Sequence, residues 1–193
     1  MTTTAALAAA RENRRPELLN VGTVVWLSSE LMFFSGLFAA YFTLRAQSAA
    51  WPPPGVNLDT PSATIATALL VLSSGTMQLG VRALEKGNRR HYLAWLAATF
   101  VMGAIFVLSQ ARDWAKLDFS IASHAYGSVF YLMTGFHGLH VVGGLVAMMV
   151  MFGRASSRRF GPSGLPAAEM LSYYWHFVDV VWIGLWATIF FIR

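Results

Sequence analysis

Polar side chains that can bind metals or move protons lie inside long apolar stretches of this chain. His176 and Asp179 are three residues apart in YWHFVDVVW, which runs from Tyr174 to Trp182. A charged Asp at the centre of a bilayer costs about 2.5–3.5 kcal/mol on insertion scales. Such a pair therefore needs hydrogen-bonding partners or a function, and three functions fit: metal or haem ligation, a proton relay, or a structural network.

Two further segments carry residues of this kind. Glu30 lies in SSELMFF, about 15 Å into an apolar stretch, where a carboxyl should be protonated or hydrogen-bonded. His137 and His140 lie in TGFHGLH, on one face of a helix. Counting along the chain places His140 and His176 at similar depths. We therefore expect a polar cluster in which His176 and Asp179 meet these histidines or a lipid headgroup, and we favour a structural role that fixes helix register.

Haem binding can be tested by histidine spacing. His124 and His137 are thirteen residues apart, which would suit two stacked haems, but no second segment carries a matching pair. One haem between His137 and His176 remains open, which would make the chain a b-type haem membrane anchor. A proton-coupled transporter that uses Glu30 and Asp179 is a second alternative, disfavoured because the sequence shows no inverted repeat.

The composition is typical of an integral membrane protein. The chain has 193 residues, of which 56% are hydrophobic and 12% charged, and its mean hydropathy is +0.52. Soluble domains carry about 25% charged residues. The absence of cysteine excludes disulfides, thiolate nucleophiles and thiolate-ligated metals.

Five stretches are long and apolar enough to cross a bilayer as helices: residues 21–44, 62–81, 92–111, 123–152 and 169–191. We therefore predict an all-α membrane protein, with a cytoplasmic tail over residues 1–19 and a transmembrane five-helix bundle over residues 20–193. The net charge of +5 follows the positive-inside rule rather than indicating nucleic acid, and it places the N-terminus inside and the C-terminus outside. The basic residues expected inside are Arg11, Arg14, Arg15, Arg82, Lys86, Arg89, Arg90, Arg154, Arg158 and Arg159.

Three segments resemble subunit III of the haem–copper cytochrome c oxidases. They are WLSSELMFFSGLFAAYF (26–42), AYGSVFYLMTGFHGLHVVGG (125–144) and SYYWHFVDVVWIGLWATIFFIR (172–193), and they occur in the family's order. These motifs and the WPPPG loop (51–55) look most like the short, five-helix form of actinobacteria. The long form has seven helices. The first two of those, which form one arm of a lipid cleft, would here be absent or supplied by another subunit.

The resemblance implies an accessory subunit of an aerobic respiratory oxidase, a proton-translocating complex of the bacterial plasma membrane. Such a subunit has no catalytic site and no redox centre; it packs on catalytic subunit I, binds phospholipid, supports proton uptake and protects against turnover inactivation. By resemblance, Glu30 is the carbodiimide-reactive intramembrane carboxyl. The polar network and lipid contacts would be made by His137, His140, Trp175, His176 and Asp179.

The resemblance also implies partners. Haem a and copper would be held by partner subunits I and II, and further partners would be subunit IV and a cytochrome bc complex in a supercomplex. Five histidines and no cysteine fit neither subunit I, which needs six histidine ligands, nor subunit II, which needs a cysteine pair. Five-helix forms also occur in haem–copper quinol oxidases, so the electron donor, cytochrome c or quinol, stays open.

Overall fold

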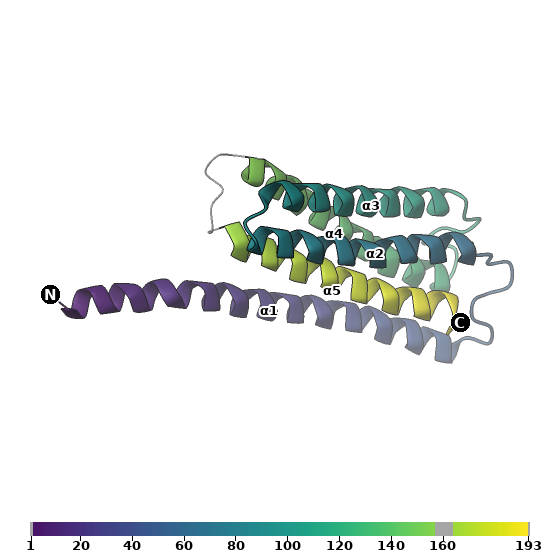
Figure 1. Ribbon diagram of the computed structural model, residues 1–193. Coiled ribbons are helices and arrows are strands. Elements are labelled where there is room, and N and C mark those ends of the chain that lie inside the picture. The colour runs from purple at the N-terminus through teal and green to yellow at the C-terminus, as the bar shows by residue number, and fades with distance from the viewer. Residues whose placement is uncertain (1, 157–163, 193) are drawn as a thin grey trace.

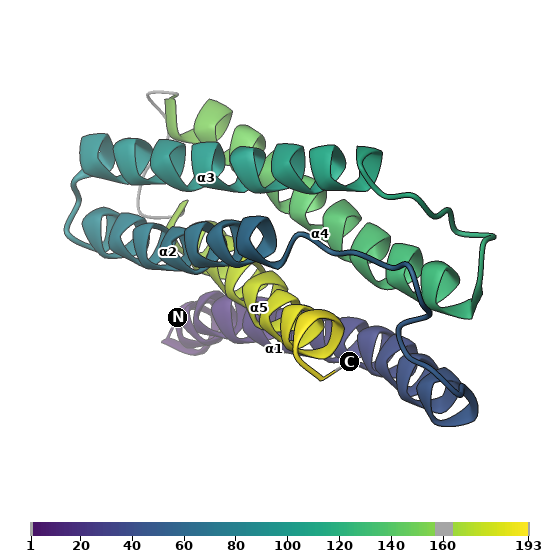
Figure 2. The same ribbon diagram turned by 90° about the vertical axis from the view of Figure 1, so that its right-hand side faces the viewer.

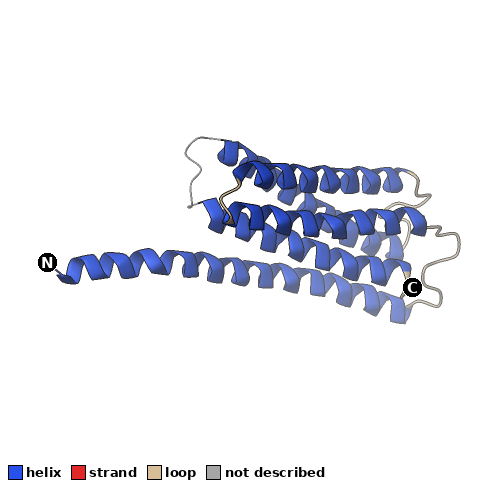
Figure 3. Cartoon of the chain, in the orientation of Figure 1, coloured by secondary structure: helices blue, strands red, loops and turns tan. Residues whose placement is uncertain are grey.

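The computed structural model describes residues 2–156 and 164–192, with side chains from residue 21 onward. This part of the chain folds into five helices, as expected, and none of its residues lies in a strand (Figure 3). The helices are α1 (Thr2–Gln47), α2 (Thr60–Glu85), α3 (Arg89–Ala115), α4 (Ala125–Ser156) and α5 (Leu165–Phe190). The segment expected as a tail before the first span continues helix α1 without a break from Thr2.

Four of the helices are long and apolar enough to cross a membrane. They are α2, α3, α4 and the part of α1 from Val21 to Gln47. Helix α5 has 26 residues but is not among them. The polar and aromatic residues between Tyr173 and Trp186 lower its mean hydropathy. The prediction of apolar spans is thus confirmed for four helices, and for α5 it is not.

Successive helices run antiparallel along one axis, so the two ends of the chain lie at opposite ends of the bundle (Figure 1). Helix α5 packs against α1, α2 and α4, and α3 packs against α2 and α4. Helix α1 lies at the edge of the bundle against α4 and α5 (Figure 2). The interior is thus built mainly around α4 and α5, the two helices that carry the predicted histidines.

Local sequence signals fix the helix ends. The side chains of Asp59 and Asn88 accept hydrogen bonds from backbone N–H groups in the first turns of α2 and α3. Gly87 has a φ of +73°, which lets the chain reverse between these helices in a short turn. The basic linker expected between the last two helices, with Arg158 and Arg159, lies largely outside the described residues.

The indole of Trp175 on α5 contacts three other helices at the core. Trp175 of α5 is fully buried, and its Nε1–H donates to Ser73 Oγ of α2 at 2.9 Å. Its ring lies between Gly103 of α3 and Gly144 of α4. A Cβ atom at either glycine would come within 2.7 Å of the ring. These two glycines therefore form the slot that accepts the indole, and small residues allow the helices to approach closely.

We expect Gly144→Ala to lower the free energy of unfolding by about 1–3 kcal/mol, because the added methyl overpacks against a rigid ring. Unfolding of the purified chain in mixed detergent micelles, followed by circular dichroism, measures this change. Gly36→Ala is the matched control, because nothing lies within 4 Å of a Cβ atom at Gly36. Equal free energies of unfolding for Gly144→Ala and Gly36→Ala would contradict the claim that Gly144 forms part of a tight slot for the indole.

Candidate functional site: two intramembrane polar clusters

The first polar cluster joins α1 to α4, and we call it the α1–α4 cluster. Glu30 Oε2 lies 3.0 Å from His140 Nε2, and Glu30 Oε1 accepts a hydrogen bond from Trp26 Nε1–H at 3.1 Å. The Tyr174 hydroxyl of α5 donates to the backbone oxygen of His140 at 2.8 Å, and its ring stacks on that of Trp26. Both carboxyl oxygens of Glu30 are therefore engaged by other side chains.

The contacts of His140 fix where one proton lies. Its Nδ1 lies 2.7 Å from the backbone oxygen of Phe136, which can only accept, so Nδ1 carries a proton. The short contact between Nε2 and Glu30 then requires one further proton. Either the carboxyl holds it and donates to the imidazole, or the imidazole holds it and the two form an ion pair. The pair can thus store one proton on either partner.

The second polar cluster joins α2 to α5, and we call it the α2–α5 cluster. Ser74 Oγ lies 2.8 Å from His176 Nδ1 and donates a hydrogen bond to Asp179 Oδ2. Gln78 Oε1 lies 3.4 Å from His176 Nε2. Asp179 is 3% exposed, whereas Ser74, Gln78 and His176 are partly exposed. The serine hydroxyl therefore bridges the two groups that the sequence had singled out.

The expected meeting of His176 and Asp179 with the histidines of α4 is wrong. His176 and Asp179 face α2, and His140 faces α1. His137 is fully buried away from both clusters, with its ring stacked on Trp182 at a centroid distance of 4.8 Å and edge-on to Phe106. Neither ring nitrogen of His137 has a hydrogen-bond partner among the described residues.

The structure also places the histidines considered for haem. His124 accepts a hydrogen bond at Nδ1 from Gly127 N–H at 2.8 Å, so its ring caps the start of α4. His137 and His176 are not brought together, since one packs against α3 and α5 and the other contacts α2. Among the described residues, no group of three or more His, Cys, Asp or Glu side chains could hold a metal ion.

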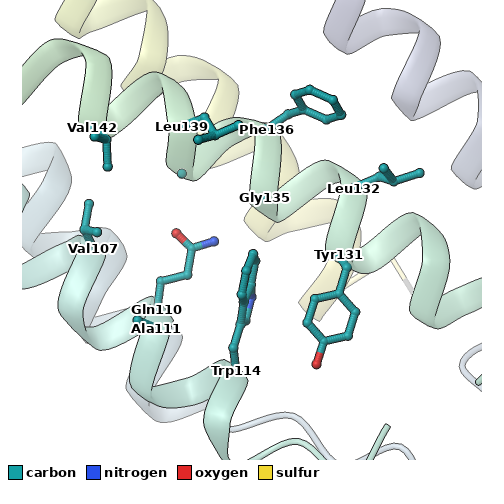
Figure 4. A pocket seen from close by; sticks show the side chains of 11 residues that line it. Val107, Gln110, Ala111, Trp114, Tyr131, Leu132, Gly135, Phe136, Leu139 and Val142 are labelled. Carbon is teal, nitrogen blue, oxygen red and sulfur yellow. The ribbon is translucent and has the colours of Figure 1, made fainter. Parts of the chain in front are cut away.

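An apolar pocket of about 410 Å³ lies between α3 and α4 (Figure 4). Trp114, Tyr131 and Phe136 supply aromatic walls, and Gly135 and Gly138 of α4 leave room between the helices. The amide of Gln110 points into it from α3, and its Nε2 donates to the backbone oxygen of Thr134 at 2.9 Å. The shape and lining suit a hydrocarbon chain.

Sequence reasoning missed the partners of both clusters: Trp26, Tyr174, Ser74 and Gln78. The available signal was the run SSGTMQ (73–78), which places four polar residues in the middle of an apolar helix. Intramembrane Ser and Gln side chains often hydrogen-bond across helices.

Apolar helices that enclose polar clusters at mid-height define an integral membrane protein of the helical-bundle class. The sequence profile of the family described as cytochrome c oxidase subunit III matches residues 2–193. The chain belongs to the cytochrome c oxidase subunit III family.

Named relatives are similar over nearly their whole length. A probable cytochrome c oxidase subunit 3 of Nocardia farcinica is 52% identical over 183 residues, covering 93% of this chain and 90% of the relative. A protein of the same name from Mycobacterium tuberculosis H37Rv is 50% identical, covering 98% and 96%. Cytochrome c oxidase subunit 3 of Thermostichus vulcanus is 36% identical, covering 96% and 92%. Family membership and the apolar helices identify an integral membrane subunit of a respiratory haem–copper oxidase.

Proposed function

We propose that this chain is an accessory subunit, without a redox centre of its own, of an aerobic cytochrome c oxidase in the bacterial plasma membrane. It packs on catalytic subunit I, supports proton uptake and protects the complex against turnover inactivation. The observation that carries the proposal is the family match over residues 2–193. Haem a and copper belong to partner subunits I and II.

The proton-related role is supported by the α1–α4 cluster. Glu30 and His140 share one proton and are both partly exposed at the edge of the bundle, with side-chain exposures of 25% and 17%. A carboxyl–imidazole pair of this kind can pass its shared proton from one partner to the other.

We also propose a membrane topology with five spans. Helix α5 is the fifth span, the N-terminus lies inside and the C-terminus lies outside. The 26 residues of α5 are enough to cross a bilayer, and α5 runs alongside the four apolar helices (Figure 1). Two of the polar side chains that lower its hydropathy, those of His176 and Asp179, face α2, which reduces their cost in lipid. The α2–α3 turn, at the end of the bundle assigned to the cytoplasm, carries Lys86, Arg89 and Arg90.

Phospholipid binding is part of the same proposal. The apolar pocket between α3 and α4 suits one acyl chain, because Gln110 is the only one of its eleven lining residues with a side-chain amide or charge. The polar amide of Gln110 lies near the end of α3, five residues before its last residue, Ala115.

Purification of the chain from native membranes in a mild detergent tests the proposal. We expect it to co-purify with haem a, with a large histidine-rich subunit and with a copper-binding, cysteine-containing subunit. Co-purification of subunit IV and a cytochrome bc complex would extend the assembly to a supercomplex. A quinol-oxidizing complex without the copper-binding subunit would assign the chain to the quinol branch, and haem b on the isolated chain would refute the accessory role.

Glu30→Gln is expected to leave the haem spectrum of the purified oxidase intact, because Glu30 contacts Trp26 and His140 of this chain and the proposal places haem in subunit I. Its effect should be limited to proton-uptake kinetics or to the number of turnovers before inactivation. Optical spectra and oxygen consumption over time measure both. Loss of the haem spectrum in this variant would contradict the assignment.

A further inference from the structure

A mid-height surface on α2 and α5, which we call the α2–α5 face, presents hydrogen-bonding groups toward the outside of the bundle. It comprises Ser74, Gly75, Gln78, His176 and Val180. Gly75 and Val180 are exposed, Val180 by 67%, and the three polar side chains are partly exposed. Figure 1 shows α2 and α5 side by side, with α4 behind them. The face is thus open in the isolated chain.

The face lies deep in the membrane span. Ser74 is about 11 residues from the end of α2 at Glu85, and His176 is about 11 residues from the start of α5 at Leu165. Because the helices are antiparallel, both residues lie about 16 Å from the same end of the bundle. Water does not reach this depth in a lipid bilayer, so lipid chains or another protein must cover the face.

Part of the hydrogen-bonding capacity of this face is unused. The amide Nε2 of Gln78, a partly exposed residue, makes no hydrogen bond among the described residues. The α1–α4 cluster differs, because both oxygens of Glu30 are engaged there. Hydrocarbon chains offer no hydrogen bonds, so a polar side chain from another polypeptide completes the α2–α5 face at lower free energy than lipid does.

The shape of the face admits a helix. Gly75 leaves a gap on α2 next to the polar groups, since nothing lies within 4 Å of a Cβ atom there. Exposed glycines of this kind let a second helix backbone come close. We propose that the α2–α5 face binds a transmembrane helix of another oxidase subunit, which places a hydrogen-bonding side chain beside Gln78 and His176. This inference rests on the proposed function, because the partner is a subunit of the same complex.

Photocrosslinking in the assembled oxidase tests this contact. p-Benzoylphenylalanine replaces Val180, and a control chain carries it in place of Leu108, which is 69% exposed on α3. After irradiation, mass spectrometry should identify an adduct with another oxidase subunit at position 180 and adducts with lipid at position 108. Adducts at position 180 with lipid alone, or with a second copy of this chain, would overturn the inference.

The same sample separates this inference from the proposed function. Co-purification of haem a before irradiation shows that the chain belongs to the oxidase, whatever position 180 then binds. Gly75→Leu supplies a second test, because its side chain fills the gap; we expect about tenfold less chain to co-purify with haem a. Gly36→Leu, at an exposed glycine on α1, is the control. Co-purification of Gly75→Leu with haem a at the wild-type level would overturn the inference. If Gly75→Leu does not fold, the crosslink at position 180 is the deciding test.

Discussion

Trp175→Ala is expected to lower the free energy of unfolding of the isolated chain by about 3–5 kcal/mol, the range for removal of a fully buried aromatic side chain. The reason is geometric. The indole fills the slot between Gly103 and Gly144, and neither glycine has a side chain that could move into the cavity. The hydroxyl of Ser73 also loses its donor. Denaturation of the purified chain in mixed micelles, followed by circular dichroism, measures the loss.

Trp175→Phe separates packing from hydrogen bonding, because it keeps an aromatic ring in the slot and removes only the N–H donor and part of the ring. We expect it to cost about 1–2 kcal/mol, the usual effect of losing one buried hydrogen bond with a small change in volume. A loss below about 1 kcal/mol in Trp175→Ala would show that the slot collapses around the smaller side chain, and that Trp175 does not hold α5 to the other three helices.

His140→Leu should destabilise the chain by up to about 3–5 kcal/mol, because it leaves the carboxyl of Glu30 partly buried without its imidazole partner. The double variant Glu30→Leu/His140→Leu should be much closer to wild type, since it removes both polar groups together. Equilibrium unfolding of the wild type, the two single variants and the double variant gives the coupling energy between the two residues. Additive single effects would mean that the 3.0 Å contact contributes nothing to stability.

The sequence predicted the depth of each polar residue but not the direction in which it points. Residue counting placed Glu30, His140 and His176 near the middle of their helices, and the structure has them there. The neighbours of a helix and its rotation about its own axis depend on packing with the rest of the bundle. His140 therefore contacts α1 although His137, one turn earlier, faces the interior between Phe106 and Trp182.

The two adjacent serines of α2 show the same limit. Successive helical residues point about 100° apart, so Ser73 meets Trp175 while Ser74 meets His176 and Asp179. Serine hydroxyls in helices can bond back to their own helix, as those of Ser28 and Ser35 do, and Ser73 donates to the backbone oxygen of Leu70 while it accepts from Trp175. The sequence does not distinguish serines that bond only within their own helix from serines that also bond to another helix. The difference depends on which helix packs against the serine.

The position of Trp175 sets an order of events during biosynthesis. Helix α5 is made after the other four helices, so these enter the membrane before the side chain that fills the space between Gly103 and Gly144 exists. Helix insertion and helix packing are separate stages in membranes. The packing step that closes the space between Gly103 and Gly144 therefore comes after the synthesis of α5, the last helix of the chain.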